Sequence, residues 1–159
     1  MSKLQYLIPL SLACFFGLSA QNQSQSTMKQ ILHTAQAPQA IGPYSQGVGF
    51  GNLWFFSGQI ALDPATGSMK NENIDMEIEQ VLNNIDALLK AAGASWGDIV
   101  KTSIFLLDMD DFGTVNTAYA RRFNSDFPAR ETVAVAQLPR GARVEISVVV
   151  ARAHPAQGN

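Results

Sequence analysis

Hydrophobic residues recur along this chain with two periods, and the change from one period to the other outlines the secondary structure. Apolar residues spaced three and four apart predict helices over 75–92 and 110–123, and Gly93 is a typical residue just after a helix end. Apolar runs bounded by turn residues predict strands over 48–50, 53–60, 100–107, 131–137 and 143–151. This order, ββ-α-β-α-ββ, predicts an α+β domain with one sheet and both helices on one face.

The sheet face that the helices leave open also carries apolar residues. Phe105, Val133, Val135 and Val149 are expected there from the alternation of the strands. A monomer would expose this surface to water, so the pattern predicts assembly with other copies of the chain.

The last two strands are expected to form a hairpin that turns near Arg140. In that register Glu145 pairs with Val135, and Arg130 lies roughly 17 Å further along, at about 3.3 Å per residue. Arg130 and Glu145 of one chain could then hardly reach the same small ligand, whereas copies from neighbouring chains could.

The start of the chain differs from the rest. Lys3 is the only charge before a nearly apolar segment over 4–20, and a polar run follows over 21–27. This pattern predicts a signal peptide over 1–20, a flexible linker over 21–29, and export to the periplasm or the outside of the cell. An uncleaved membrane anchor is the alternative, for which the apolar span is short.

Composition narrows the function classes. The remaining length fits one domain over 30–152, followed by a tail over 153–159. The net charge is −2 and no basic run exists, which disfavours nucleic-acid binding as the main role. Once the signal peptide is removed, no membrane contact is expected.

The inventory of reactive side chains is short. Cys14 is the only cysteine and lies in the predicted leader, so the mature domain has no thiol nucleophile, disulfide or cysteine metal site. His33 and His154 have no carboxylate or second histidine at ligand spacing, which is typical of surface residues. Without a glycine-rich phosphate loop or dinucleotide motif, neither a metal nor a cofactor is expected.

Two charged residues stand out in the apolar C-terminal part. Arg130 follows Pro128 and Ala129, which keep the backbone extended, and a stiffly held guanidinium suits a two-pronged grip on a small carboxylate. Glu145 lies among β-branched residues, where a carboxylate is costly unless something pairs with it. The local sequence leaves simpler interpretations open: a surface arginine, and a glutamate at a strand edge or in a structural ion pair.

Seven short motifs, in order, resemble those of the reactive intermediate deaminase (RidA) family. They are APQAIGPYSQG at 37–47, FSGQI at 56–60, DPATG at 63–67, DIVKT at 98–102, DFGTVN at 111–116, PAR at 128–130 and LPRG at 138–141. The resemblance covers about residues 30–152. It implies a chorismate-mutase-like fold, a homotrimer, and sites in the clefts between subunits.

The resemblance also implies an activity, the hydrolysis of 2-imino acids or their enamine tautomers to 2-keto acids and ammonia. Arg130 would hold the substrate carboxylate, and Glu145 would orient the attacking water and move a proton. A protonated imine is already electrophilic, so this chemistry requires neither a metal nor a covalent nucleophile.

Four further residues are implied to bind the substrate: Tyr44, Gly58, Asn116 and Thr132. Each also has a simpler interpretation from the sequence, namely packing for Tyr44, a β-bulge for Gly58 and a satisfied core amide for Asn116. Thr132 stands where some relatives have cysteine, which excludes thiol chemistry there and leaves a hydroxyl that could bind the departing nitrogen.

Three other function classes remain open on the sequence. A binding module could hold small carboxylates without turning them over, although such a role needs no glutamate. A chaperone-like or nucleic-acid-directed interaction protein is the second class, and the acidic balance disfavours RNA. A chorismate-mutase-like pericyclic enzyme is the third, and it would need more cationic residues than the motifs supply.

Overall fold

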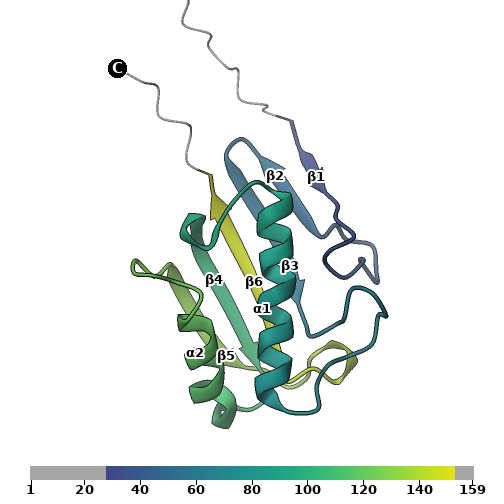
Figure 1. Ribbon diagram of the computed structural model, residues 1–159, viewed down its shortest axis with the longest axis vertical. Helices are drawn as coiled ribbons and strands as arrows, with labels where there is room; N and C mark the ends of the chain where they lie inside the picture. The colour runs from purple at the N-terminus through teal and green to yellow at the C-terminus, as the bar shows by residue number, and fades with distance from the viewer. Residues whose placement is uncertain (1–27, 153–159) are drawn as a thin grey trace, which may run out of the picture.

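The computed structural model describes residues 28–152, which form one mixed sheet of six strands covered by two helices (Figure 1). The strands are β1 Gln30–Leu32, β2 Gly47–Phe50, β3 Leu53–Gln59, β4 Ile99–Leu106, β5 Ala129–Ala134 and β6 Val144–Ala151. The helices are α1 Ile74–Ala91 and α2 Phe112–Ala120, with short 3-10 turns at Trp96–Asp98, Met109–Asp111 and Pro139–Gly141. The predicted leader, most of the linker, the tail and His154 lie outside the described residues.

Helix α1 has clear signals at both ends. The Asn73 side chain accepts a hydrogen bond from the Met76 amide at the N-terminus, and Asp75 lies in the first turn, where the helix dipole favours a negative charge. Gly93, just past the C-terminus, has a φ of 64°, a conformation that glycine adopts without strain. The helix therefore begins and ends close to the predicted bounds.

The core lies between the helices and one face of the sheet. The even-numbered residues of β6, from Val144 to Val150, are buried on that face. They pack with a stripe on α1 that consists of Ile78, Val81, Leu82, Ile85, Leu88 and Leu89. Both helices cover this same face, as the sequence predicts (Figure 1).

The predicted terminal hairpin is wrong. The strand order is β1-β2-β3-β6-β4-β5, so β6 pairs with β3 and β4, and β5 lies parallel to β4 at the sheet edge. The segment 135–143 carries the chain around the end of β4, where the Val135 amide donates to Leu106 and the Leu107 amide donates to the Arg143 carbonyl. This crossing separates the two strands, and the residue that pairs with Glu145 is Phe105, not Val135.

Two smaller differences concern short elements. Strand β1 is absent from the sequence prediction because three residues give too little alternation to recognise. Helix α2 is shorter than predicted, since its first predicted residues form a 3-10 turn and the chain leaves the helix after Ala120.

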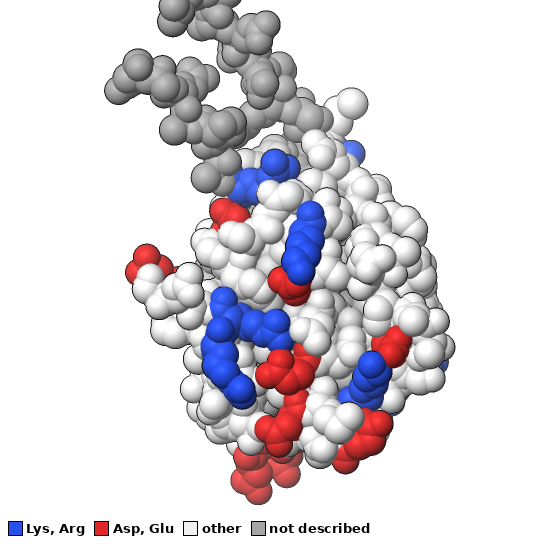
Figure 2. Space-filling view, viewed as in Figure 1, with Lys and Arg blue, Asp and Glu red and all other residues white. Residues whose placement is uncertain are grey.

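Three of the four apolar residues predicted on the open face of the sheet lie there, beside an ion pair between Lys101 and Glu131. Ser103 on the same face donates a hydrogen bond to Glu131. Phe55 and Val133 are 48% and 43% exposed there, and the register places Phe105 and Val149 on the same side. The helix-bearing side shows many positive and negative side chains interspersed (Figure 2). Within residues 28–152, no helix combines the length and hydrophobicity needed to cross a membrane.

Candidate functional site

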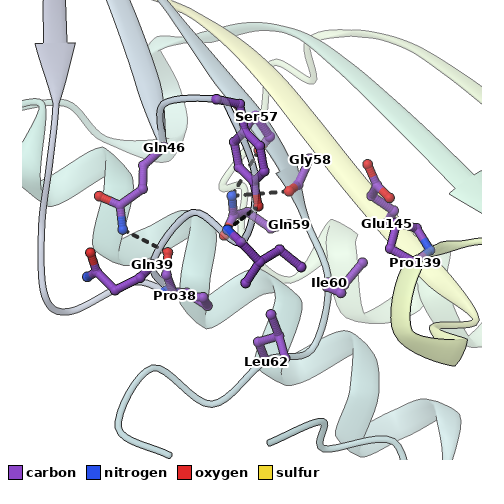
Figure 3. Close-up of a pocket in the computed structure, with 12 residues that line it drawn as sticks. Pro38, Gln39, Gln46, Ser57, Gly58, Gln59, Ile60, Leu62, Pro139 and Glu145 are labelled. Carbon is purple, nitrogen blue, oxygen red and sulfur yellow. Dashed lines mark hydrogen bonds between the residues drawn. The ribbon is translucent and has the colours of Figure 1, made fainter. Parts of the chain in front are cut away.

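The predicted site residues lie in two separate hollows. The first, which we call the glutamate hollow, has a volume of about 350 Å³ and is bounded by the loop after β1, the end of β3 and the start of β6 (Figure 3). Three predicted residues, Tyr44, Gly58 and Glu145, line it together. Gln59 and Pro139 also line this hollow; they belong to the motifs at 56–60 and 138–141 but were not predicted as site residues.

Glu145 packs directly against Gly58 on the neighbouring strand (Figure 3). A Cβ atom at residue 58 would overlap Oε1 of Glu145 and stand 2.7 Å from its carboxyl carbon. Gly58 lies where the pairing of β3 with β6 shifts register between Phe56 and Gln59, so it is also the bulge residue that its sequence suggests. The absence of a side chain here leaves room for the carboxylate.

The Glu145 carboxyl is half-buried, and burial raises its pKa above the ordinary value of 4.5. Within residues 28–152 it forms no hydrogen bond or ion pair, so the interpretation as half of a structural ion pair does not hold there. A carboxyl group that lines a hollow and has a raised pKa is suited to proton transfer.

The raised pKa predicts how stability depends on pH. The folded state binds the Glu145 proton more tightly than the unfolded state, so this stabilising contribution is complete at low pH and is lost as pH rises through the folded pKa. Glu145→Gln should therefore gain stability relative to wild type as pH is raised from about 4 to 7. Chemical denaturation at several pH values measures it. The exposed Glu72→Gln is the control, and an equal pH dependence in both variants would contradict the assignment.

The loop that carries Tyr44 is held by Gln46. The Gln46 side chain accepts from the Thr34 amide at 2.8 Å and donates to the carbonyls of Thr34 and Pro38. The Tyr44 hydroxyl accepts from the Ile41 amide at 3.2 Å, and the Tyr44 side chain is 47% exposed. Tyr44 therefore lies on the rim of the glutamate hollow in a braced loop and is not packed in the core.

The second hollow, the arginine hollow, lies between α2 and the segment that leads into β5. Arg130 lines it and donates from Nη1 to Oδ1 of Asn116 at 2.9 Å. Its guanidinium carbon lies 5.2 Å from the ring centre of Tyr119. Phe127, which is 62% exposed, and Pro128 form the outer wall. The structure thus brings together Arg130 and Asn116, two of the predicted site residues.

Thr132 lines neither hollow. It follows Arg130 by two residues on the same face of β5, and its register partner is Ile104. Its Oγ1 atom is buried and has no hydrogen-bond partner among the described residues. The Thr132 hydroxyl therefore has no partner among the described residues, but it is not accessible to a ligand at the surface of a single chain.

Arg130 and Glu145 of one chain project to opposite faces of the sheet. Arg130 pairs with Thr102, whose side chain is buried under the helices, and Glu145 pairs with Phe105 on the open face. Three residues along β4 and two strand spacings also separate their Cα atoms, roughly 14 Å in all. The expectation that one chain cannot bring them together stands, although the hairpin that suggested it does not exist.

Sequence reasoning did not find two other features near the site. Tyr119 was not predicted as a site residue, although its i to i+3 spacing from Asn116 places the two side by side on a helix. Glu77 is fully buried and accepts from the backbone amide and Nε of Arg143, at 2.7 and 3.0 Å. This ion pair ties the start of β6 to α1.

In residues 28–152, no three His, Cys, Asp or Glu side chains converge as a metal site would require.

Comparison with known proteins adds independent findings. The model of the family described as Endoribonuclease L-PSP matches residues 34–152. The human 2-iminobutanoate/2-iminopropanoate deaminase is 44% identical over 124 residues, which cover 78% of this chain and 90% of the human protein. The Salmonella typhimurium protein of the same name is 44% identical over 79% of this chain and 99% of its own length.

Solved structures give the same result for the fold. A Thermotoga maritima protein described as a putative endoribonuclease superposes with a TM-score of 0.77 at 46% identity, over 80% of this chain and all of that one. E. coli TdcF with bound serine has a TM-score of 0.75 at 39% identity, over 78% of this chain and 99% of TdcF.

Proposed function

Because the chain belongs to the reactive intermediate deaminase family, we propose that it hydrolyses 2-imino acids to 2-keto acids and ammonia. The observation that carries the proposal is the pair of hollows. One contains a guanidinium with a free edge that can bind a carboxylate, and the other contains a carboxyl group that has no hydrogen-bond or ion-pair partner in residues 28–152. Relatives named as 2-iminobutanoate/2-iminopropanoate deaminases support it, as does a related structure with a bound amino acid, serine.

The chemistry follows from these groups. Arg130 binds the substrate carboxylate through two parallel hydrogen bonds and so fixes the position of the adjacent imine carbon. Glu145 accepts a proton from a water molecule as the water oxygen bonds to that carbon. The C=N electron pair moves to the nitrogen of the protonated imine, which gives a carbinolamine, and the proton then passes from Glu145 to this amine nitrogen. As the carbon–nitrogen bond breaks and ammonia leaves, the hydroxyl of the carbinolamine returns its proton to Glu145 and the carbonyl forms. Water is the only co-reactant.

We further propose that each complete site contains one hollow from each of two neighbouring chains in a homotrimer. Arg130 and Glu145 face opposite sides of one sheet, so a single substrate can contact both only if they come from different chains. The exposed apolar side chains of Phe55 and Val133 on the open face support packing between copies. Thr132 lies two residues after Arg130 on the same strand, so its buried hydroxyl would be close to the Arg130 side of such a cleft.

The proposed activity has a direct test. An amino-acid oxidase generates 2-imino acids from several amino acids, and semicarbazide traps whatever imine has not yet hydrolysed. Residues 28–159 should accelerate imine loss, fastest for small uncharged side chains, and Glu145→Gln should lose roughly 100-fold or more in rate. Binding of 2-ketobutanoate without acceleration of hydrolysis would refute the enzyme and leave a carboxylate-binding module.

Sharing of the site between chains predicts complementation. Arg130→Ala and Glu145→Ala should each keep only about 1% of the activity as pure oligomers. Refolding a mixture should restore part of the activity, because some clefts then contain both groups. In an equal, random mixture, about a quarter of the clefts recover both residues. Native mass spectrometry establishes that mixed trimers formed. Mixed trimers without recovered activity would place both groups of each site in one chain.

A further inference from the structure

Tyr119 is the feature of the arginine hollow that the proposed reaction does not yet use. Its ring is 2% exposed, and the Arg130 guanidinium lies over it, 5.2 Å from the ring centre. Phe112, one helical turn before Asn116, also faces the guanidinium at 5.9 Å. An aromatic face attracts a cation within about 6 Å of its centre, and the planar guanidinium suits such a surface.

The Tyr119 ring is itself fixed from the sheet. Its hydroxyl forms a 2.9 Å hydrogen bond with Oγ1 of Thr102, which is fully buried. Thr102 is the register partner of Arg130 on the adjacent strand. The ring is therefore anchored to the residue directly beside Arg130, so ring and arginine keep their relative position.

Asn116 restricts rotation of the Arg130 guanidinium within the plane of the guanidinium group. It accepts from Nη1 of Arg130, which leaves the opposite edge, Nε and Nη2, without a hydrogen-bond acceptor in residues 28–152. That edge has two parallel N–H groups, which can donate two hydrogen bonds to the oxygens of one carboxylate. Asn116 therefore acts on the arginine, although the sequence interpretation assigned it to the substrate.

We propose that Tyr119 and Asn116 are positioning residues that hold the Arg130 guanidinium in a preset orientation for a 2-oxo or 2-imino carboxylate. Tyr119 supports one face of the guanidinium through its ring, and Asn116 fixes one edge. Neither needs to touch the substrate. Preset orientation spares the arginine the loss of side-chain freedom that would otherwise accompany ligand binding. The proposal deepens the proposed function, on which its kinetic consequence rests.

The test measures binding of 2-ketobutanoate, a stable 2-oxo carboxylate, by titration calorimetry of the assembled protein. Tyr119→Leu should weaken binding roughly 3- to 30-fold, since the aromatic face is lost. Tyr119→Phe, which keeps the ring, should stay within about threefold of wild type. Asn116→Ala should weaken binding roughly 3- to 10-fold. Asn116 is only partly buried, so this variant tests the proposal even if Tyr119→Leu fails to fold.

A double-mutant cycle separates positioning from mere packing. If Tyr119 acts through the planar guanidinium, Tyr119→Leu should cost less than about twofold in binding when Arg130 is already lysine. Equal losses in both backgrounds would overturn the proposal, and so would wild-type binding by Tyr119→Leu or Asn116→Ala. Failure of the wild-type protein to bind 2-ketobutanoate would also overturn it. Binding that follows this pattern without imine hydrolysis would refute the proposed function alone.

Discussion

Replacing Arg130 with lysine should reduce kcat/KM for 2-imino acid hydrolysis by roughly 100-fold or more, although the charge is unchanged. Lysine offers a point charge on a flexible stem, whereas the guanidinium offers a flat fork. Only the fork can rest on the Tyr119 ring, donate to Asn116 and present a second edge to a carboxylate. A substrate held less firmly places its imine carbon away from the attacking water.

The oxidase-coupled assay measures this effect, and Arg121→Lys is the matched control. Arg121 is an exposed arginine just beyond α2 and lines neither hollow. The same substitution there should leave kcat/KM within about twofold. If Arg130→Lys keeps kcat/KM within a few-fold of wild type, the carboxylate grip is not the role of Arg130, whatever the reaction.

Gly58→Ala should lower the rate roughly 100-fold by displacing Glu145, with little effect on folding. The new Cβ would overlap the carboxylate, which would have to rotate away from its place in the glutamate hollow. The backbone of Gly58 lies outside the left-handed region, so alanine introduces no backbone strain. The change thus tests the position of a carboxylate without altering it chemically.

The matched control is Gly113→Ala on α2, where an added Cβ meets no atom within 4 Å. That variant should keep wild-type activity. In Glu145→Ala, the further change Gly58→Ala should cost little, because the group that it displaces is already absent. A full additional loss in the double variant would show that residue 58 acts independently of Glu145, for example through its backbone.

The elements and the layer arrangement could be predicted from the sequence because hydrophobic period reports directly on which face is buried. The period indicates helix α1, and the largely apolar β4 is paired on both sides, one strand in from the sheet edge. Strand pairing was harder, since β5 and β6 are adjacent in sequence and their alternation fits a hairpin equally well. The crossing over the end of β4 depends on long-range pairing that no local pattern encodes.

For the site residues too, the sequence predicts which residues take part but not how the fold arranges them. A motif contains Arg130, and Glu145 stands out as a carboxylate among β-branched residues, but their opposite orientation follows from register with β4, which the sequence alone does not give. The packing of Glu145 on Gly58 joins residues from β3 and β6, far apart in the chain. The Tyr119 ring beneath Arg130 could be anticipated only once β5 was known to lie beside α2.

The place of β6 in the sheet has a consequence for when the domain can fold. This last strand lies between β3 and β4, so it joins two parts of the sheet that otherwise share no strand pairing. Until it is synthesised, β1–β3 and β4–β5 remain separate fragments, each with an unpaired edge and an uncovered apolar surface. This long-range pairing requires β6, and its loop-closure entropy slows it. We therefore expect the nascent domain to stay unfolded until β6 has been made, when it folds in a single cooperative step.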